Sequence, residues 1–415
     1  MLQLIVEASC SALRLALPLM QSAASKSAKL TANAAEALPA GALEAKLELA
    51  EKEGRQLRVK LGLDPTAPDI HLGHSVVLTK LREFQDQGHR VVLIVGDYTA
   101  RVGDPSGRSE TRPVLTAEEI VANAQSYEAQ AARILDQDPE RYELRFNSEW
   151  LNMPMTDLLS LMRTTTVAQL LEREDFATRY KGGSPISVLE LLYPLMQGYD
   201  SVAIESDVEI GGTDQTFNIL LGRDIQRHYG IPEQAVITMP ILVGIDGAEK
   251  MSKTKGNEIA IEASADEMFG RTMRLPDRAM ASWFELLAIS PPPQSSEPRD
   301  QKVALAKAIV ARFHDAAAAE RAEAQFVSQF VDHEIPDEID SVAFDASDGS
   351  VHLPMVIADA FGISRSEARR LVEQGGVKLD GTVVASAELD ISAKRLSGSV
   401  VQIGRRRFKR FKLRV

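Results

Sequence analysis

The stretch from Leu57 to Gly96 places the strongest constraint on the fold of this chain. Residues 57–63, LRVKLGL, read as a strand, a turn follows at 64–66, and helical periodicity extends from about 73 to 87. Residues 90–96, RVVLIVG, then form a second apolar run. A buried strand, a helix and another buried strand in this order predict a β-α-β unit, in which the two strands pair in parallel.

Later segments continue the alternation. Strand candidates at 143–146, 207–210 and 235–242 are separated by helical stretches at about 117–135, 187–197 and 213–228. The pattern predicts an α/β fold: an open, doubly wound, parallel-sheet (Rossmann-like) domain over residues 46–262, in which ligands bind at the carboxyl ends of the strands. Residues 150–183 have helical periodicity without a strand and are interpreted as a helical insertion.

The C-terminal third of the chain is organised differently. After Ile261 the sequence turns helical, which predicts an α-helical domain over 263–332, followed by an acidic linker at 333–350. A small α+β domain is predicted over 351–415. It carries thirteen Lys and Arg against six Asp and Glu, or +7, whereas the first 350 residues have 34 against 53, or −19. Such a basic end predicts polyanion binding, and a solvated tail without a partner is the alternative.

Composition excludes several classes of protein. None of the apolar runs reaches the roughly 18 residues of a membrane span, so no membrane association is expected. Cys10 is the only cysteine, which excludes a disulfide framework and favours a reducing, cytoplasmic compartment. Residues 1–45 carry no motif and are predicted to be a poorly ordered extension. A start codon at Met20 and an organellar transit peptide are the alternatives.

Two motifs carry phosphate chemistry. His71-Leu72-Gly73-His74 stands where a loop gives way to a helix, whose N-terminal N–H groups hold phosphate. Gly73 allows close approach of a nucleotide, and the two imidazoles can donate hydrogen bonds. Lys250-Met251-Ser252-Lys253-Thr254 follows the turn at 246–247 and precedes Gly256, as in a mobile loop, so its two lysines could close over a triphosphate. Each motif alone is ordinary; together, in one α/β domain, they predict ATP chemistry.

Two further groups of residues could form a pocket for a small ligand. Tyr193, Gln197 and Asp200 lie four and seven positions along one helix face, so an aromatic side chain, an amide and a carboxylate can converge. The turn from Gly103 to Arg108, with Arg112 shortly after, presents one carboxylate and guanidinium groups. A solvated helix face and simple loop punctuation are the alternatives.

These motifs resemble the His-Ile-Gly-His and Lys-Met-Ser-Lys-Ser signatures of class I aminoacyl-tRNA synthetases. Residues 192–200, LYPLMQGYD, and 211–215, GGTDQ, resemble the tyrosyl-tRNA synthetases in particular, and the resemblance runs from about Leu57 to the C-terminus. It implies activation of L-tyrosine by ATP with Mg²⁺, followed by transfer to the 3′ end of tRNA(Tyr). The resemblance implies a homodimer. It implies no covalent enzyme intermediate, no protein-bound metal and no permanently bound cofactor.

The resemblance also implies roles for single residues. Catalytic roles fall on His71, His74, Lys250, Lys253, Thr254, Thr66, Arg108 and Arg112. The tyrosine site would consist of Asp64, Asp104, Tyr193, Gln197, Asp200 and Gln215, with Asp200 at the substrate hydroxyl. The adenylate would be held by Gly73, Gly212, Asp214, Lys250 and Lys253.

One position departs from the better-known branch of this family. There a tyrosine two residues before the glycine of the first strand contacts the substrate hydroxyl, whereas this chain has Lys60. The resemblance is therefore to a second bacterial branch, in which Asp200 has a different helper. This family is itself the standard example of a site that rejects the analogue lacking a hydroxyl by roughly 10⁴–10⁵ without editing.

The C-terminal unit resembles the small RNA-binding fold of a ribosomal protein of the small subunit. The helix from Ser364 and the hairpin from Gly375 would place cations along an RNA backbone. The expected RNA-binding residues are Arg365, Arg369, Arg370, Lys378, Arg405, Arg406, Arg407, Lys409 and Arg410. The helical region 263–332 would then bind the anticodon arm. A tryptophan-specific enzyme and a non-catalytic RNA-binding paralogue are the competing readings of the whole chain.

Overall fold

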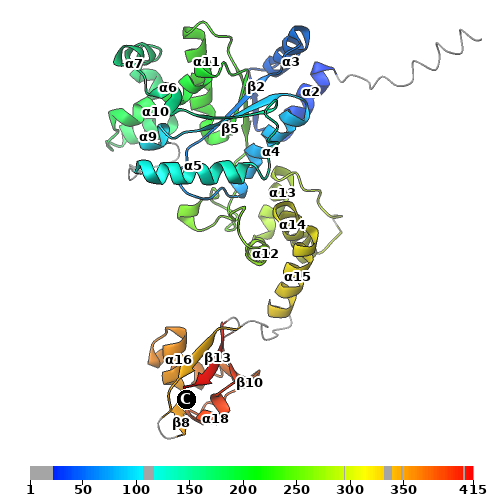
Figure 1. Ribbon diagram of the computed structural model, residues 1–415, viewed down its shortest axis with the longest axis vertical. Helices are drawn as coiled ribbons and strands as arrows, with labels where there is room; N and C mark the ends of the chain where they lie inside the picture. Colours follow the sequence, from blue (N-terminus) through cyan, green and yellow to red (C-terminus); the bar gives the residue numbers. More distant parts are fainter. Residues whose placement is uncertain are drawn as a thin grey trace, which may run out of the picture. The chain divides into compact units, whose positions relative to one another are not determined.

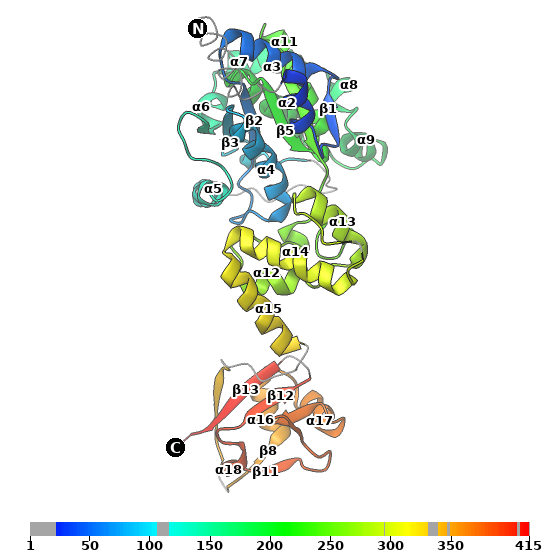
Figure 2. The ribbon, with the colours of Figure 1, turned by 90° about the vertical axis from the view of Figure 1, so that its right-hand side faces the viewer.

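The computed structural model describes residues 22–105, 116–293, 295–330, 339–346, 349–404 and 407–414. The chain divides into two compact units (Figures 1 and 2). The first comprises Met1–Ala263 with Arg271–Leu305, and the second comprises Ser264–Gly270 with Ala306–Val415. The predicted helical region 263–332 is thus shared between the two units and does not form a third one.

A six-stranded sheet, in the order β1-β6-β5-β2-β3-β4, lies at the centre of the first unit. All neighbours from β6 to β4 pair in parallel, which confirms the predicted parallel sheet. The chain runs from β2 to β3 and β4 on one side of β2, and then returns to β5 and β6 on the other side. The topological switch point therefore lies between β2 and β5. The parallel strands are β2 (Arg58–Leu63), β3 (Arg90–Val95), β4 (Tyr142–Phe146), β5 (Val208–Gly212) and β6 (Ala235–Met239).

Helices cover both faces of this sheet, as its right-handed crossovers require. Figure 1 shows α2 (Ala23–Leu30), α3 (Ala42–Glu53) and α4 (Leu72–Asp86) on one side, and α10 (Val188–Ala203) with α11 (Thr216–His228) on the other. Gly198 allows α10 and α11 to approach closely, because a Cβ there would lie 3.2 Å from the Cα of Gly222.

Short helices connect and extend these layers. The predicted insertion at 150–183 is helical, as expected, and the described part of the loop after β3 leads into a long helix. These elements are η1 (Thr99–Arg101), α5 (Ala117–Ala131), α6 (Ser148–Leu151), α7 (Met155–Met162), α8 (Val167–Leu170), α9 (Glu174–Lys181), η2 (Thr213–Gln215) and η3 (Lys253–Lys255). α13 (Asp277–Leu286) buries Trp283, whose Nε1 donates to the Val243 carbonyl at 3.1 Å.

The prediction of a poorly ordered extension is wrong for the described residues 22–45. β1 (Glu36–Leu38) pairs antiparallel with β6 and covers that edge of the sheet. Leu30 of α2 is fully buried, and the Lys80 ammonium of α4 donates to the Ala32 carbonyl at 2.8 Å. The sequence signal was weak because this segment is rich in Ala and Ser, which bury little area per residue.

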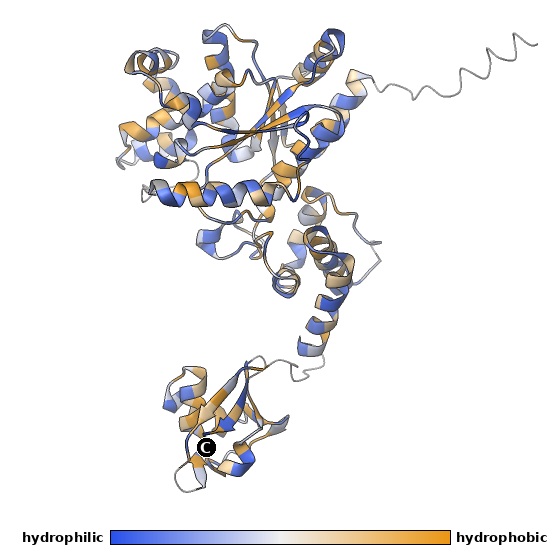
Figure 3. Cartoon of the chain, in the orientation of Figure 1, coloured by the Kyte–Doolittle hydropathy of each residue, from blue (hydrophilic) through white to orange (hydrophobic). Residues whose placement is uncertain are grey.

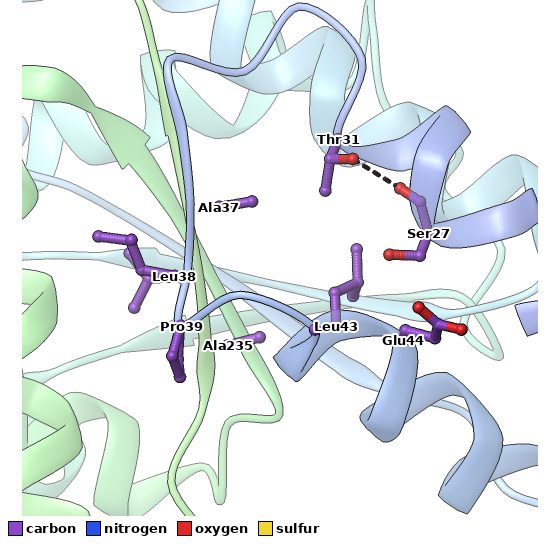
Figure 4. A pocket seen from close by; sticks show the side chains of 10 residues that line it. Ser27, Thr31, Ala37, Leu38, Pro39, Leu43, Glu44 and Ala235 are labelled. Carbon is purple, nitrogen blue, oxygen red and sulfur yellow. Dashed lines mark hydrogen bonds between the residues drawn. The ribbon is translucent and has the colours of Figure 1, made fainter. Parts of the chain in front are cut away.

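A pocket of about 150 Å³ lies between α2, β1 and the start of α3 (Figure 4). Ser27 from α2, Thr31 at its C-cap, Leu38 from β1 and Glu44 from α3 are among the residues that line it. Its floor is formed by Ala235 and Val236, at the amino end of β6. This pocket is therefore at the opposite end of the strand from the edge at which ligands of parallel sheets bind.

The second unit contains a five-stranded sheet in the order β10-β9-β12-β13-β7 and a two-stranded sheet of β11 with β8. Its apolar core includes Val372, Val401 and Phe411, all fully buried. β7 (Ser341–Phe344) pairs in parallel with β13, so the predicted linker at 333–350 is wrong for these residues, and the compact fold begins before residue 351. Residues 333–338 and 347–348 of that linker lie outside the described part.

The remaining elements are α16 (Leu353–Phe361), α17 (Arg365–Glu373), α18 (Ala393–Leu396), β8 (Ser350–His352), β9 (Val377–Leu379), β10 (Thr382–Val383), β11 (Asp390–Ser392), β12 (Val400–Ile403) and β13 (Arg407–Leu413). The helical region contains α12 (Ala265–Thr272), α14 (Pro298–Phe313) and α15 (Ala316–Phe330). Within the described ranges, every helix is too short or too polar to cross a membrane.

Candidate active site

The predicted site residues of the first unit gather at the carboxyl edge of the sheet. Asp64 follows β2, Gly212 ends β5 and Asp214 lies in η2 just beyond it. Gly62 on β2 is exposed, and a Cβ there would meet nothing within 4 Å, so the sheet surface is open at this point. The switch-point topology thus accounts for the position of the site.

His71 and His74 form the start of α4. His71 is the N-cap residue, and its Nδ1 accepts a hydrogen bond from the Gly73 N–H at 3.1 Å. The His74 Nδ1 accepts from the His71 N–H at 3.2 Å, and the ring centroids are 3.9 Å apart. A Cβ on residue 73 would lie 2.9 Å from the His71 ring, so glycine is required there.

Both imidazoles are neutral near pH 7. Burial lowers the pKa of His71 to about 2, and the neighbouring His74 and Lys250 add to this effect. Burial and then Lys250 lower the pKa of His74 to about 4. Because each Nδ1 accepts a backbone N–H, the single ring proton is on Nε2, and each ring presents one N–H donor.

The lysine motif is fixed to the histidine motif through the backbone. The Leu72 N–H donates to the Ile259 carbonyl at 2.9 Å, and the Ile261 N–H donates to the Ile70 carbonyl at 3.0 Å. Asn257 holds the loop from inside: its Oδ1 accepts from the Ser252 N–H at 2.8 Å. The two motifs, almost 180 residues apart, therefore face each other as predicted.

The two lysines of the loop pair with carboxylates on different sides of the site. Lys250 forms an ion pair with Asp214, and the Lys253 ammonium lies 2.7 Å from the Asp69 carboxylate. Both ammonium groups are about half exposed, at 57% and 49%. Ion pairs this exposed contribute roughly 0–1 kcal/mol, so a phosphate can replace either carboxylate at little cost.

Tyr193 and Asp64 belong to one hydrogen-bonded chain. The buried Tyr193 hydroxyl donates to the Asp64 carboxylate at 2.9 Å, and the Thr99 hydroxyl donates to its other oxygen at 2.7 Å. The Asn147 amide then donates to the Thr99 hydroxyl at 3.0 Å. Gly96 makes room for this chain, because a Cβ there would lie 2.1 Å from the Asp64 carboxylate.

A second chain joins Asp104 to Gln197. The Gln215 amide donates to Asp104 at 2.7 Å, and the Asn218 amide donates to two side-chain oxygens, Gln215 Oε1 at 3.1 Å and Gln197 Oε1 at 3.0 Å. The buried Arg173 guanidinium supports it by donating to Asn218 at 3.0 Å and to Asp104 at 3.4 Å. The predicted convergence of Gln197, Gln215 and Asp104 is therefore present.

Asp200 is almost fully buried, at 3% exposure. Burial raises the pKa of its carboxyl group to about 7, while the charge of Lys60 and a hydrogen bond from Trp150 act in the opposite direction. The Trp150 indole N–H donates to the carboxylate at 2.8 Å. Trp150 is thus the group that orients Asp200, a partner which the sequence had left unnamed.

Lys60 is also buried, and it forms an ion pair with Glu209 of β5 at 2.9 Å. The exposed fractions of the two side chains are 0% and 2%. Removal of one partner from a buried pair typically costs about 3–5 kcal/mol, since the other charge is left without compensation. The pair lies beneath the turn of α10 that carries Gln197 and Asp200.

Several predicted residues are placed differently or not at all. Arg108 and Arg112 lie outside the described residues. Thr254 is exposed in η3, and Thr66 is half-buried after β2. In the ranges that the structure describes, no group of three or more His, Cys, Asp or Glu side chains could hold a metal ion.

The sequence did not point to Trp150, Asn147, Asn218, Arg173 or Asp69 as site residues. Asn147 and Trp150 follow β4, so their position after a strand was a usable signal. Arg173 was not predictable, because it comes from the helical insertion and reaches the site only through the packing of that insertion on α11.

The predicted RNA-binding residues of the second unit fall on two surfaces. Arg365, Arg369 and Arg370 are exposed on α17, which packs on the core side of the sheet through Ala368 and Val372. Strand alternation places Lys378 and Arg410 on the opposite face of the sheet. Arg407 stacks on Phe361 with 5.3 Å from its guanidinium carbon to the ring centroid, and Lys409 is half-buried. Arg405 and Arg406 lie outside the described residues.

Comparison with known proteins agrees with this arrangement. Residues 52–331 match the family model of tRNA synthetases class I (W and Y), and residues 353–393 match the S4 domain. The chain belongs to the class I aminoacyl-tRNA synthetases that act on tryptophan or tyrosine.

Similar proteins narrow the group. The chain is 48% identical to the tyrosine–tRNA ligase of Moorella thermoacetica, over 91% of this chain and 93% of that protein. It is 49% identical to that of Bordetella avium, over 89% and 92%. Within its class, the chain is therefore a member of the tyrosyl-tRNA synthetase family.

Solved structures share the fold at lower identity. A truncated mitochondrial tyrosyl-tRNA synthetase of Aspergillus nidulans has a TM-score of 0.60 and 23% identity, and covers 75% of this chain and 94% of its own. The tyrosyl-tRNA synthetase of Archaeoglobus fulgidus complexed with L-tyrosine has a TM-score of 0.59 and 24% identity, with 72% and 99% covered.

The neutral state of the two histidines is open to direct measurement. We expect the ring ¹⁵N resonances of His71 and His74 to show the Nε2–H tautomer and no titration between pH 5.5 and 8.5, because both pKa values lie at about 4 or below. The urea-unfolded protein is the control, in which all histidines titrate near pH 6.5. Protonation of either ring above pH 5.5 in the folded protein would contradict this assignment.

Proposed function

We propose that this protein activates L-tyrosine with ATP, forming tyrosyl-adenylate and pyrophosphate, and transfers tyrosine to the 3′ end of tRNA(Tyr). The observation that carries the proposal is the position of Asp200. A buried carboxylate, oriented by Trp150, lies on the same helix as Tyr193 and Gln197, and Tyr193 is hydrogen-bonded to Asp64 at the carboxyl end of β2. The names of the relatives support the same activity.

The polar side chains of the candidate active site are suited to both ends of tyrosine. A phenol hydroxyl can donate to the Asp200 carboxylate, which is buried and would be left unpaired by phenylalanine. The α-ammonium group can be held by Asp104, Tyr193 and Gln197, which the two hydrogen-bonded chains keep in place. Asp64 holds Tyr193, and Gln215 holds Asp104, through these hydrogen bonds.

The nucleotide side of the site stabilises charge. The N-terminus of α4 and the Nε2–H groups of His71 and His74 can bind phosphate oxygens in the transition state, when negative charge moves toward the leaving pyrophosphate. Lys250 and Lys253 can exchange their carboxylate partners for the triphosphate. Mg²⁺ would arrive with ATP as part of the substrate. Gly212 and Asp214, at the end of β5, would hold the ribose.

Amino-acid-dependent exchange of labelled pyrophosphate into ATP tests this proposal. We expect exchange with L-tyrosine and at least 10⁴-fold lower kcat/KM with phenylalanine, because the buried carboxylate loses its partner. Exchange with tryptophan would favour the tryptophan-specific alternative. Absence of exchange with every amino acid, while the protein still binds tRNA, would favour the non-catalytic paralogue.

We also propose that the basic second unit binds tRNA. Arg365 and Arg370 on α17 are exposed, and neither forms an ion pair with a carboxylate of the described residues. Arg369, in contrast, pairs with Glu373 at 2.8 Å. The S4-domain match over residues 353–393 includes this helix. Contacts of this kind are with phosphates, so they strengthen binding without reading sequence.

Substitution of both arginines should separate tRNA binding from amino-acid activation. Arg365→Ala/Arg370→Ala should raise the KM for tRNA and reduce the slope of log affinity against log salt by about 1.5–2, while pyrophosphate exchange is unchanged. Arg82→Ala, which removes an exposed arginine of α4, is the matched control. Equal effects of the two changes on tRNA charging would leave α17 without an RNA-binding role.

A homodimer is the third part of the proposal. Met155, Leu159 and Met162 form a stripe along α7 with exposed fractions of 67%, 48% and 41%, and Figure 3 shows the apolar character of this helix. An exposed apolar stripe of this kind is typical of a protein–protein contact. A second copy of the chain is the partner that the resemblance implies.

Introduction of a charge into this stripe should produce monomers. We expect Leu159→Asp to halve the sedimenting mass at micromolar concentration, because the buried charge opposes association. Val121→Asp is the control, since Val121 is 56% exposed on α5, away from the stripe. A monomeric wild type, or a dimer that tolerates Leu159→Asp, would exclude α7 as the contact.

A further inference from the structure

Lys60 has no hydrogen-bond donor left for a substrate. An ammonium group has three N–H donors. The Lys60 Nζ lies 3.0 Å from the main-chain carbonyl oxygen of Gln197, 2.8 Å from the Ser201 hydroxyl and 2.9 Å from the Glu209 carboxylate, which accounts for all three. Lys60 therefore cannot replace the tyrosine of the better-known branch as a contact of the substrate hydroxyl.

Glu209 is bonded to the same turn of α10. Its carboxylate accepts from the Ser201 hydroxyl at 3.0 Å, from the Gln197 amide at 3.5 Å, and from the Gln234 amide as well. Lys60 and Glu209 come from the adjacent strands β2 and β5, where residues 60 and 209 are paired. The ion pair thus fastens α10 to the sheet at positions 197 and 201, on both sides of Asp200.

We propose that the buried Lys60–Glu209 pair is a positioning element for substrate specificity: it fixes the turn of α10 from which Asp200 and Gln197 reach the amino acid. This inference rests on the proposed function. Lys60 and Glu209 are positioning residues, and neither contacts tyrosine. Asp200 alone, with Trp150 behind it, accepts the substrate hydroxyl.

The turn of α10 needs such support because its own backbone is weak there. Pro194 lies inside the helix and removes one backbone hydrogen bond. Gly198 lowers helix propensity, and it cannot be replaced by alanine without a clash, since a Cβ would lie 2.5 Å from Ile225. Close packing on α11 thus excludes a better helix former, and the ion pair supplies rigidity from the other side.

The pair also acts on Asp200 through its charges. The titratable and polar groups that face Asp200 are Lys60 on β2, Glu209 on β5, Tyr193 on α10, and Asn147 and Trp150 after β4. Lys60, Asn147 and Trp150 lower the pKa of Asp200, whereas Glu209 raises it. The ionised carboxylate accepts the phenol O–H more strongly than the protonated carboxyl group does, so tyrosine binding should strengthen as the pH rises through the pKa of Asp200, at about 7.

The experiment measures kcat/KM for tyrosine and phenylalanine in pyrophosphate exchange from pH 5.5 to 9. Lys60→Met should move the midpoint of the tyrosine profile to higher pH, Glu209→Gln should move it to lower pH, and the double variant should return it toward the wild-type value. Asp200→Asn, which has no titrating group at this position, should show no such step.

Ser201→Ala distinguishes the effect of the pair on the position of α10 from the effect of its charges on Asp200. This variant keeps both charges but loses the Ser201 link, one of the two positions at which they hold α10, so it is also the milder change if Lys60→Met folds poorly. We expect a tyrosine-to-phenylalanine ratio about 10²-fold lower, as displacement of a binding group by about 1 Å can cause, with an unchanged pH midpoint. The KM for ATP should stay the same.

The matched control is the ion pair between Arg55 and Asp207. Asp207 directly precedes β5, and neither side chain is hydrogen-bonded to residues 197–201 of α10. Arg55→Met/Asp207→Asn should lower thermal stability but leave the specificity ratio and the pH midpoint unchanged. If it changes them as much as Ser201→Ala does, or if Ser201→Ala and Lys60→Met leave them unchanged, the inference is overturned. Absence of tyrosine-dependent exchange in the wild type would instead overturn the proposed function.

Discussion

Parallel pairing of β2 with β3 on one side and with β5 on the other is the constraint on which the site depends. Because all three strands end at the same edge, Asp64, His71 and Asp214 come together although 150 residues separate the first from the last. The chain runs from β2 to β3 and β4 on one side and then returns to β5 on the other side of β2, and the sheet surface is open at Gly62 near this switch point. A substrate can therefore lie against strand ends and a helix N-terminus at once.

The floor of this site is polar, which is unusual for the centre of an α/β sheet. Lys60, Glu209, Asp200, Asn218 and Arg173 are all buried, and each is bonded to at least one of the others or to a close neighbour. Buried charges are tolerated only when they are paired and hydrogen-bonded. Such a floor has few alternative packings, so it fixes the side chains that, under the proposed function, would distinguish a phenol from a phenyl ring.

The sequence predicted the parallel sheet, the two phosphate motifs and the Tyr193-Gln197-Asp200 face, because each depends on local periodicity or on short spacing. It did not predict Trp150, Arg173 or the Lys60–Glu209 pair, which depend on how distant elements pack. The extension at 22–45 was misjudged for a related reason: β1 is only three residues long and gains its stability from pairing with β6. Residues 341–344 likewise form a strand only because β13 is beside them.

The carboxylates that pair with Lys250 and Lys253 would compete with the proposed triphosphate ligand for the two ammonium groups. Asp214 and Asp69 already neutralise the two ammonium groups, so a triphosphate bound as proposed would enter by exchange and not by attraction to an uncompensated charge. Salt weakens the departing and the arriving pairs together. Under the proposed function, the loop would favour an anion with several charges in a row, because a single phosphate could displace only one of the two carboxylates.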